Sequence, residues 1–260
     1  MILEVKDLCC GYDDVEVIKD ISFTVETGEV LCLLGPNGVG KTTLFRAMLG
    51  FLKPSNGEIL LDGVDISLLD RKTYAKAVGY VPQAHTPPFP YSVLDVVIMG
   101  RSPHIGNYSS PKEKDYRIAE ECLQKMGIAH LKNRTYTEIS GGERQLTLIA
   151  RALAQEPNIL IMDEPTSNLD YGNQIKVLQY IKGIAKGGMA VIMTTHSPNH
   201  AFLCATKVAA LGNGSHLKVG TREEIITPNN LKALYGIEVE IKSSIGQNTG
   251  IEYKYCVPNI

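Results

Sequence analysis

Short apolar runs separated by helical stretches occur toward both ends of the 260-residue chain. The run at residues 30–34 is bounded by Gly28 and Gly35, which is typical of a strand buried on both faces. Apolar or alternating runs predict further strands at residues 1–7, 17–25, 58–61, 78–81, 159–162, 189–194, 208–211 and 217–219. Helical patterns lie between them, at residues 41–49, 171–186 and 229–235. The alternation predicts an α/β fold with a mixed, parallel-rich sheet.

The middle of the chain has a different pattern. Three prolines lie between residues 84 and 90, which predicts irregular backbone there. From that point to about residue 157 the pattern is mostly helical, with helices expected at residues 93–99, 112–126 and 143–155. We therefore expect one domain over residues 1–260. It has a core lobe at 1–83 and 158–240, a helical subdomain at about 84–157 and a short C-terminal tail at 241–260.

Composition narrows the class of protein. The chain has 26 Lys and Arg against 28 Asp and Glu, so its formal net charge is −2, without the basic excess of a general nucleic-acid binder. No apolar stretch approaches the about 18 residues that a membrane-spanning helix needs, and the N-terminal segment lacks the order of a signal peptide. We expect neither an integral membrane protein nor a secreted or disordered one. Docking on a membrane protein stays open.

The six cysteines contain no C-x-x-C pair, and the adjacent Cys9 and Cys10 are a poor framework for a disulfide. In the absence of an export signal, reduced thiols are expected. Cys32 lies within the predicted strand at residues 30–34 and is expected in the core.

The strongest chemical signal follows that strand and reads Gly35-Pro36-Asn37-Gly38-Val39-Gly40-Lys41-Thr42. It matches the P-loop pattern G-x-x-x-x-G-K-[ST], whose glycines let backbone N–H groups point at phosphate oxygens. The Lys41 ammonium is expected at the β- and γ-phosphates, and the Thr42 hydroxyl is a hard oxygen ligand for Mg²⁺. Because a helix is predicted directly after the loop, phosphate binding is favoured over a simple glycine-rich turn.

Two carboxylates follow the predicted strand at residues 159–162. Asp163 and Glu164 are expected at the carboxyl edge of the sheet, where open α/β folds bind ligands. Asp163 would orient the Mg²⁺ shell and Glu164 would polarise an attacking water. A solvated strand end is the alternative for these residues alone, and the P-loop upstream favours the Mg²⁺ role.

A third motif, Ser140-Gly141-Gly142-Glu143, stands directly before a helical pattern. A serine hydroxyl and exposed N–H groups at a helix start can bind an anion. Taken alone, the motif is more typical of an ordinary N-capped helix.

The order of these motifs resembles that of the ATP-binding cassette (ABC) ATPases, and the chain looks like an ABC transporter nucleotide-binding subunit over nearly its whole length. The resemblance implies a P-loop NTPase core with an antiparallel β region and a helical subdomain, and ATP and Mg²⁺ as cofactors. It assigns nucleotide contacts to Tyr12 (stacking on adenine), to residues 35–42 with Thr43, to the signature Ser140–Gly141–Gly142–Glu143 and to Asp170. It assigns Mg²⁺ to Thr42, Gln83 and Asp163, and catalysis to Glu164, His196 and Gln83.

The same resemblance implies a head-to-tail homodimer in which Ser140 and Gly142 of one copy complete the ATP site of the other. Loss of the γ-phosphate on hydrolysis would then release the two chains. The signature departs from the family pattern at Ile139, where Leu is usual, and at Glu143, where Gln is usual. Neither departure removes the serine or the glycines.

The run Met99-Gly100-Arg101-Ser102-Pro103-His104 is similar to importers of iron–siderophore, haem and cobalamin and to a molybdate or tungstate branch. The implied partners are transmembrane permease subunits and, indirectly, an extracytoplasmic binding protein, at the cytoplasmic face of the membrane. Exposed residues around Phe89, Arg101 and His104 are the hypothesis for coupling to the permease. About twenty residues remain after residue 239, too few for an added regulatory domain.

Other functions stay as alternatives. A soluble ABC ATPase that remodels DNA or ribosomes is disfavoured by the single cassette and the net charge, and an export cassette is disfavoured by residues 99–104. A P-loop kinase or GTPase does not account for the signature or His196. His196 and His200 have the spacing of a metal pair, but Pro198 lies between them, so His200 is expected at the surface.

Overall fold

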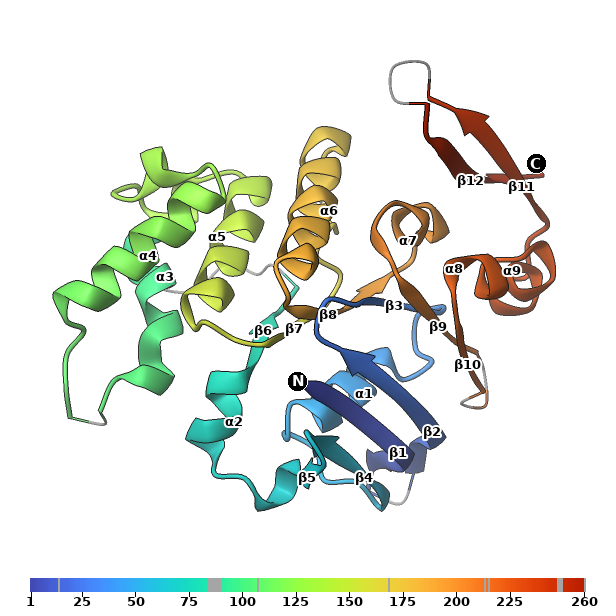
Figure 1. The fold of residues 1–260 in the computed structure, drawn as a ribbon, viewed down its shortest axis with the longest axis horizontal. Helices are drawn as coiled ribbons and strands as arrows, with labels where there is room; N and C mark the ends of the chain where they lie inside the picture. The colour runs from blue at the N-terminus through green and yellow to red at the C-terminus, as the bar shows by residue number, and fades with distance from the viewer. Residues whose placement is uncertain are drawn as a thin grey trace.

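The computed structural model describes residues 1–13, 15–83, 90–106, 108–167, 169–212, 214, 216–246 and 250–259. A six-stranded sheet runs through the centre in the order β10-β9-β3-β8-β7-β6 (Figure 1). Its strands are β3 (Val30–Leu34), β6 (Val78–Val81), β7 (Ile159–Met162), β8 (Ala190–Thr195), β9 (Lys207–Leu211) and β10 (Leu217–Gly220). All neighbours are parallel except β9 and β10. The carboxyl ends of β3, β6, β7 and β8 therefore meet at one edge, as the predicted α/β fold requires.

A second, antiparallel sheet lies beside the central one, in the order β2-β1-β4-β5. It comprises β1 (Ile2–Tyr12), β2 (Val15–Glu26), β4 (Asn56–Leu61) and β5 (Val64–Asp65). Helix α1 (Lys41–Met48) contacts β1 and β2, and Figure 1 shows it behind them. This sheet is the predicted antiparallel region.

Strand β3 is buried on both faces. Because successive side chains of a strand point to opposite faces, its residues pack alternately into two apolar clusters. Leu31 and Leu33 pack in one apolar cluster with Leu44 and Met48 of α1. Cys32 and Leu34 face the opposite cluster, which contains residues of α5 (Gly141–Ala154), α6 (Tyr171–Lys186) and α7 (Pro198–Cys204). The expectation that Cys32 lies in the core is confirmed, and all six cysteines are free thiols.

Helices α3 (Val93–Ile98), α4 (Glu113–Lys125) and α5 (Gly141–Ala154) pack against one another at the left of Figure 1. Short 3-10 helices extend this region at Met99–His104, Ala129–Leu131 and Tyr136–Glu138, and a further one lies at Ile66–Leu68. The predicted helices of the middle region are thus present, with their ends shifted by one or two residues. The lobe boundaries expected from the sequence stay a prediction.

Arg101 is not an exposed coupling residue, and that expectation is wrong. The residue is 2% exposed, and its side chain is ion-paired with Asp115 at 3.1 Å and with Glu156 at 2.7 Å. It also donates to the carbonyl of Ala154 at 2.6 Å. Arg101 is buried because Asp115 and Glu156 neutralise its charge. These partners are distant in the sequence, so the local pattern does not reveal them. His104 is exposed as expected, and Phe89 lies outside the described residues.

Several elements were not predicted. Among them are three short helices, α2 (Arg71–Ala77), α7 and α8 (Arg222–Ile225). Helix α9 (Pro228–Tyr235), in contrast, lies at its expected place. The C-terminal tail forms a hairpin of β11 (Val239–Ile245) and β12 (Glu252–Pro258), and β12 packs on α7 (Figure 1). The amide of Asn199 on α7 accepts from the backbone N–H of Cys256 at 2.7 Å, which fixes this contact. In the described part of the chain we find no helix with the length and hydropathy of a membrane span.

Candidate nucleotide-binding site

The glycine-rich loop joins the end of β3 to the start of α1. At Gly35 a Cβ atom would lie 2.4 Å from the carbonyl oxygen of Leu211, so only glycine fits against β9. Gly38 and Gly40 have φ of 83° and 106°, a conformation that side chains oppose. No side chain caps the start of α1, and its first turn holds no acidic residue. The loop therefore presents backbone donors and a positive helix end to a ligand.

Lys41 is held over this loop. Its Nζ donates to the carbonyls of Gly35 at 2.6 Å and Pro36 at 2.8 Å, and the residue is only 7% exposed. Burial lowers the pKa of the ammonium, while the negative charges of Glu164 and Asp163 oppose that shift. The cation is thus placed near both carboxylates and the loop. Thr42 beside it is exposed and Thr43 is buried.

Asp163 and Glu164 follow β7 as predicted and are both tied to Thr194 of β8. The Thr194 hydroxyl donates to Asp163 Oδ1 at 2.9 Å, and its oxygen accepts from the Glu164 N–H at 2.8 Å. Burial raises the pKa of Asp163, with the Thr194 hydrogen bond acting against it and the charge of Glu164 adding to it. A half-buried carboxylate with a raised pKa gains from a nearby cation.

The structure brings three predicted catalytic residues together. His196 Nε2 is hydrogen-bonded to Glu164 Oε1, and Gln83 Nε2 donates to Glu164 Oε2 at 3.3 Å. These side chains come from the ends of β8, β7 and β6, which are neighbours in the sheet. Glu164 has a φ of 46°, an uncommon value for a residue with a side chain. Gln83 also reaches the Ser167 hydroxyl at 3.4 Å. Thr194 was missed from the sequence.

Tyr12 lies at the end of β1 and is 41% exposed. Arg46 of α1 donates to its hydroxyl at 3.0 Å, and the guanidinium carbon lies 5.9 Å from the ring centroid. The ring is therefore connected to the helix that follows the P-loop. The contact between Tyr12 and Arg46 was not predicted. The signal in the sequence that could have indicated it is the position of Arg46 on the helix predicted directly after the P-loop.

The Ser140–Glu143 motif forms a capped helix start. The Ser140 hydroxyl accepts from the Glu143 N–H at 3.3 Å, and Glu143 Oε2 accepts from the Ser140 N–H at 2.8 Å. A Cβ atom at Gly142 would lie 2.7 Å from the Asn173 side chain, so α6 packs closely there. Asp170 caps α6 by accepting from the Asn173 N–H at 2.9 Å. Helix α5 contacts α3 and α4, whereas α1 contacts β1 and β2, and Figure 1 shows the two helices apart.

The donor set fits Mg²⁺ bound together with phosphate. Within the described residues, no group of three or more His, Cys, Asp or Glu side chains could hold a metal by itself. Mg²⁺ in proteins is usually bound by one or two carboxylates, phosphate oxygens and water. Asp163 supplies such a carboxylate, and Thr42 and Gln83 supply neutral oxygens from adjoining segments.

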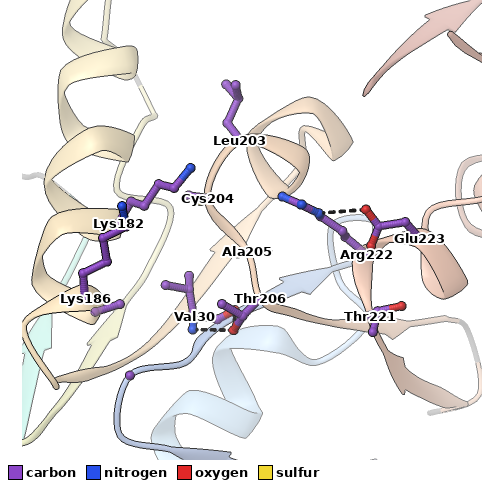
Figure 2. Close-up of a pocket in the computed structure, with 12 residues that line it drawn as sticks. Val30, Lys182, Lys186, Leu203, Cys204, Ala205, Thr206, Thr221, Arg222 and Glu223 are labelled. Carbon is purple, nitrogen blue, oxygen red and sulfur yellow. Dashed lines mark hydrogen bonds and ion pairs between the residues drawn. The ribbon is translucent and has the colours of Figure 1, made fainter. Parts of the chain in front are cut away.

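Away from these residues, a pocket of about 330 Å³ lies between α6, α7 and α8 (Figure 2). Lys182, Lys186 and Arg222 line it; Lys186 is the last residue of α6, and Arg222, the first residue of α8, directs its guanidinium at the carboxyl end of α7, which favours positive charge. Arg222 donates to the carbonyl of Phe202 at 2.9 Å and is ion-paired with Glu223 at 3.0 Å. The P-loop residues, Asp163 and Glu164 do not line this pocket, so it is separate from the candidate nucleotide site.

A glycine-rich loop of this shape before an uncapped helix binds nucleotide phosphates, so the fold and the site define a P-loop nucleotide-binding protein. The sequence profile of the family described as ABC transporter matches residues 18–167. The chain belongs to this family; it is the ATP-binding subunit of an ABC transporter and an ATPase.

Three comparisons describe its relatives. It is 40% identical to the molybdate import ATP-binding protein MolC of Haemophilus influenzae, over 84% of this chain and 81% of that protein. It is 34% identical to the iron(3+)-hydroxamate import ATP-binding protein FhuC of Bacillus subtilis, over 92% and 89%. It also matches a solved metal-chelate type ABC transporter in an inward-facing conformation, with a TM-score of 0.89, 36% identity and coverage of 99% and 97%.

Proposed function

We propose that this chain hydrolyses ATP to drive an importer for a metal chelate of the iron–siderophore, haem or cobalamin type. The observation that carries this proposal is the similarity to the metal-chelate type transporter along 99% of the chain. Import of molybdate or tungstate is the second candidate, because the chain is 40% identical to a molybdate import protein.

Nucleotide binding is assigned to the P-loop and Tyr12. The backbone of residues 35–42, with Thr43, would hold the phosphates, and Lys41 would leave the two loop carbonyls to contact the β- and γ-phosphates. The exposed ring of Tyr12 would stack on adenine while Arg46 holds its hydroxyl.

Mg²⁺ would be held by Thr42, Gln83 and Asp163, and when bound it would neutralise charge on the phosphates. Glu164 would accept the proton of the attacking water, since its carboxylate lies between Gln83 and His196. His196 would contact the γ-phosphate with the nitrogen that now bonds Glu164. Gln83 follows β6 and would report the state of the site to the next segment of the chain.

The second copy of the chain would complete the site. Ser140, Gly141, Gly142 and Glu143 would face the γ-phosphate of the partner copy, and Asp170 would lie at the same dimer interface. In its own chain helix α5 packs with α3 and α4, and its start at Gly142 lies against α6 rather than α1, which supports a role in trans.

The permease would dock in a groove of about 1010 Å³ between the end of α1, α2 and the 3-10 helix Met99–His104. Phe51 and Met99 line the groove and are exposed, so they offer apolar contacts. Gly100 is required there, because a Cβ atom would lie 1.9 Å from the Arg151 carbonyl. The chain would then lie on the cytoplasmic face of the membrane as a peripheral subunit.

The substitution Glu164→Gln tests the catalytic assignment. It should leave ATP affinity intact and lower hydrolysis by about 10²–10⁴-fold, because the amide cannot accept the proton. The matched control is Glu121→Gln on α4, an exposed carboxylate that lies 3.9 Å from the Arg117 guanidinium. Normal turnover of Glu164→Gln would remove Glu164 from the role of general base.

The cargo is tested with the permease assembled in proteoliposomes. Binding protein loaded with an iron chelate should stimulate ATP hydrolysis and chelate uptake, whereas molybdate-loaded binding protein should not. Stimulation by molybdate alone would replace the metal-chelate proposal by the second candidate.

A further inference from the structure

His200 is half-buried between two threonines that flank the proposed catalytic residues. Its Nδ1 lies 3.2 Å from the Thr195 hydroxyl and 3.3 Å from the Thr166 hydroxyl. Both threonines are buried, with exposed fractions of 3% and 5%. The expectation of a surface histidine is therefore wrong.

The two threonines belong to different segments of the site. Thr166 is two residues after Glu164, and Thr195 directly precedes His196. One imidazole nitrogen thus connects the segment that carries the proposed base to the segment that carries the proposed phosphate sensor.

Each segment is also fixed from another side. The Thr195 oxygen accepts from the Ser197 N–H at 3.2 Å, and the His200 N–H donates to the Ser197 carbonyl at 3.1 Å, which closes the turn around His196. Gln174 of α6 donates to the carbonyl of Leu169 at 3.1 Å and to that of Thr166 at 3.4 Å. His200 connects these two fixed turns.

The ring can make this connection because it is uncharged. Burial lowers the pKa of His200, which favours the neutral ring near pH 7, and in the tautomer with the proton on Nε2 the Nδ1 atom accepts a hydrogen from a threonine hydroxyl. Thr166 is held at two points. Its carbonyl accepts from Gln174 of α6, and its hydroxyl lies within hydrogen-bond distance of the His200 ring.

We propose that His200 is a positioning residue for ATP hydrolysis: by joining Thr166 to Thr195 it fixes the placement of Glu164 relative to His196. This inference rests on the proposed roles of those two residues. A displacement of about 1 Å at a catalytic group can cost about 100-fold in rate, so loss of the connection should be visible in turnover.

The test compares three variants in the full chain with Mg-ATP. His200→Leu fills the space without a polar atom and should lower kcat by about tenfold or more at an unchanged KM for ATP. His200→Asn places an amide close to the position of Nδ1 and should restore most of the rate. Asn199→Ala is the matched control, because it loosens the hairpin contact of the same helix and leaves the threonines untouched.

A double-mutant cycle shows whether His200 acts through Thr166. Thr166→Val keeps the shape and removes the hydroxyl, so it should lower kcat in the unsubstituted chain and have little further effect in His200→Leu. Additive effects of the two substitutions would overturn the proposal. So would a fall in kcat that Asn199→Ala reproduces, or one that follows the loss of thermal stability.

Glu164→Gln is measured in the same series. If Glu164→Gln is inactive and His200→Leu keeps its kcat, the positioning role alone is overturned. If Glu164→Gln turns over normally, the proposed base is overturned, and the inference on His200 falls with it.

Discussion

The two glycine-containing helix starts of this protein, at α1 and at α5, look alike in sequence and differ in structure. Both carry a glycine-rich turn followed by a helix, and each was expected to bind an anion. At α1 no side chain caps the helix, and a buried lysine lies over the loop. At α5 Ser140 and Glu143 already cap each other, and the cap brings a negative charge.

The difference indicates what each helix start can do alone. The α1 start has donors and a cation in place before any ligand arrives, so it can bind phosphate within one chain. At the α5 start the Glu143 N–H already donates to the Ser140 hydroxyl, so one backbone donor is occupied, and the Glu143 carboxylate opposes an approaching anion. It therefore needs a phosphate that is already held, as the proposed dimer would provide.

The largest effect is expected from Lys41→Ala. Removal of this buried ammonium should weaken ATP binding by about 100-fold, because a charge-assisted hydrogen bond contributes up to about 3 kcal/mol. Titration with a fluorescent ATP analogue measures the dissociation constant. Lys182→Ala, which removes a cation from the smaller pocket of Figure 2, is the matched control and should bind normally. If the two variants bind ATP with equal affinity, Lys41 does not contribute to phosphate binding, and the proposed difference between the α1 and α5 helix starts is wrong.

A smaller effect is expected from mixing Lys41→Ala with Ser140→Ala. Ser140→Ala should bind ATP with near-normal affinity and hydrolyse it poorly, since the residue is proposed to act in the partner's site. In an equal mixture about half of the dimers are mixed and hold one complete site, so about a quarter of the normal turnover should return. Steady-state hydrolysis at several protein concentrations measures this. If the mixture is no more active than its components, the α5 start does not act in trans.

The smallest effect is expected from Glu143→Gln. The hydrogen bond from the Ser140 N–H holds the pKa of Glu143 below its usual range. Its stabilisation is present above the unfolded-state pKa of about 4.3 and is lost as the pH falls through the folded-state value.

Glutamine keeps the capping box without the charge, so at pH 7 the variant should lose less than about 1 kcal/mol of unfolding free energy. It should also show a flatter decline in acid. Thermal melts from neutral pH down to about pH 2, below both pKa values, measure both. A pH dependence identical to that of the unsubstituted chain would contradict the charged cap.

The central sheet could be predicted from the sequence because its strands are uninterrupted apolar runs. Val30–Leu34, Val78–Val81 and Ile159–Met162 have the expected bounds, as does helix Tyr171–Lys186. The short helices α2, α7 and α8 could not be predicted, because four to seven residues hold too little periodicity. The residues of the hairpin β11–β12 are mostly exposed. Its strands therefore lack the apolar face from which a strand can be predicted.

In the site, the residues with a local motif were predicted and those set by long-range contacts were not. Lys41, Glu164 and His196 belong to recognisable patterns, and the structure brings the last two into contact. Arg101 was expected outside, yet its partners Asp115 and Glu156 are 14 and 55 residues away. The connections made by Thr194 and His200 likewise depend on how β7, β8 and α7 pack.

The left-handed backbone of Glu164 has a consequence for anyone who engineers this protein. A residue with a side chain at a φ of 46° costs about 1–3 kcal/mol, a cost that glycine does not bear. A library selected for heat resistance alone would therefore reward replacement by glycine of the carboxylate that is proposed to act as the general base. Stabilised versions of this protein should be screened for turnover at every round, because here durability and activity are in opposition.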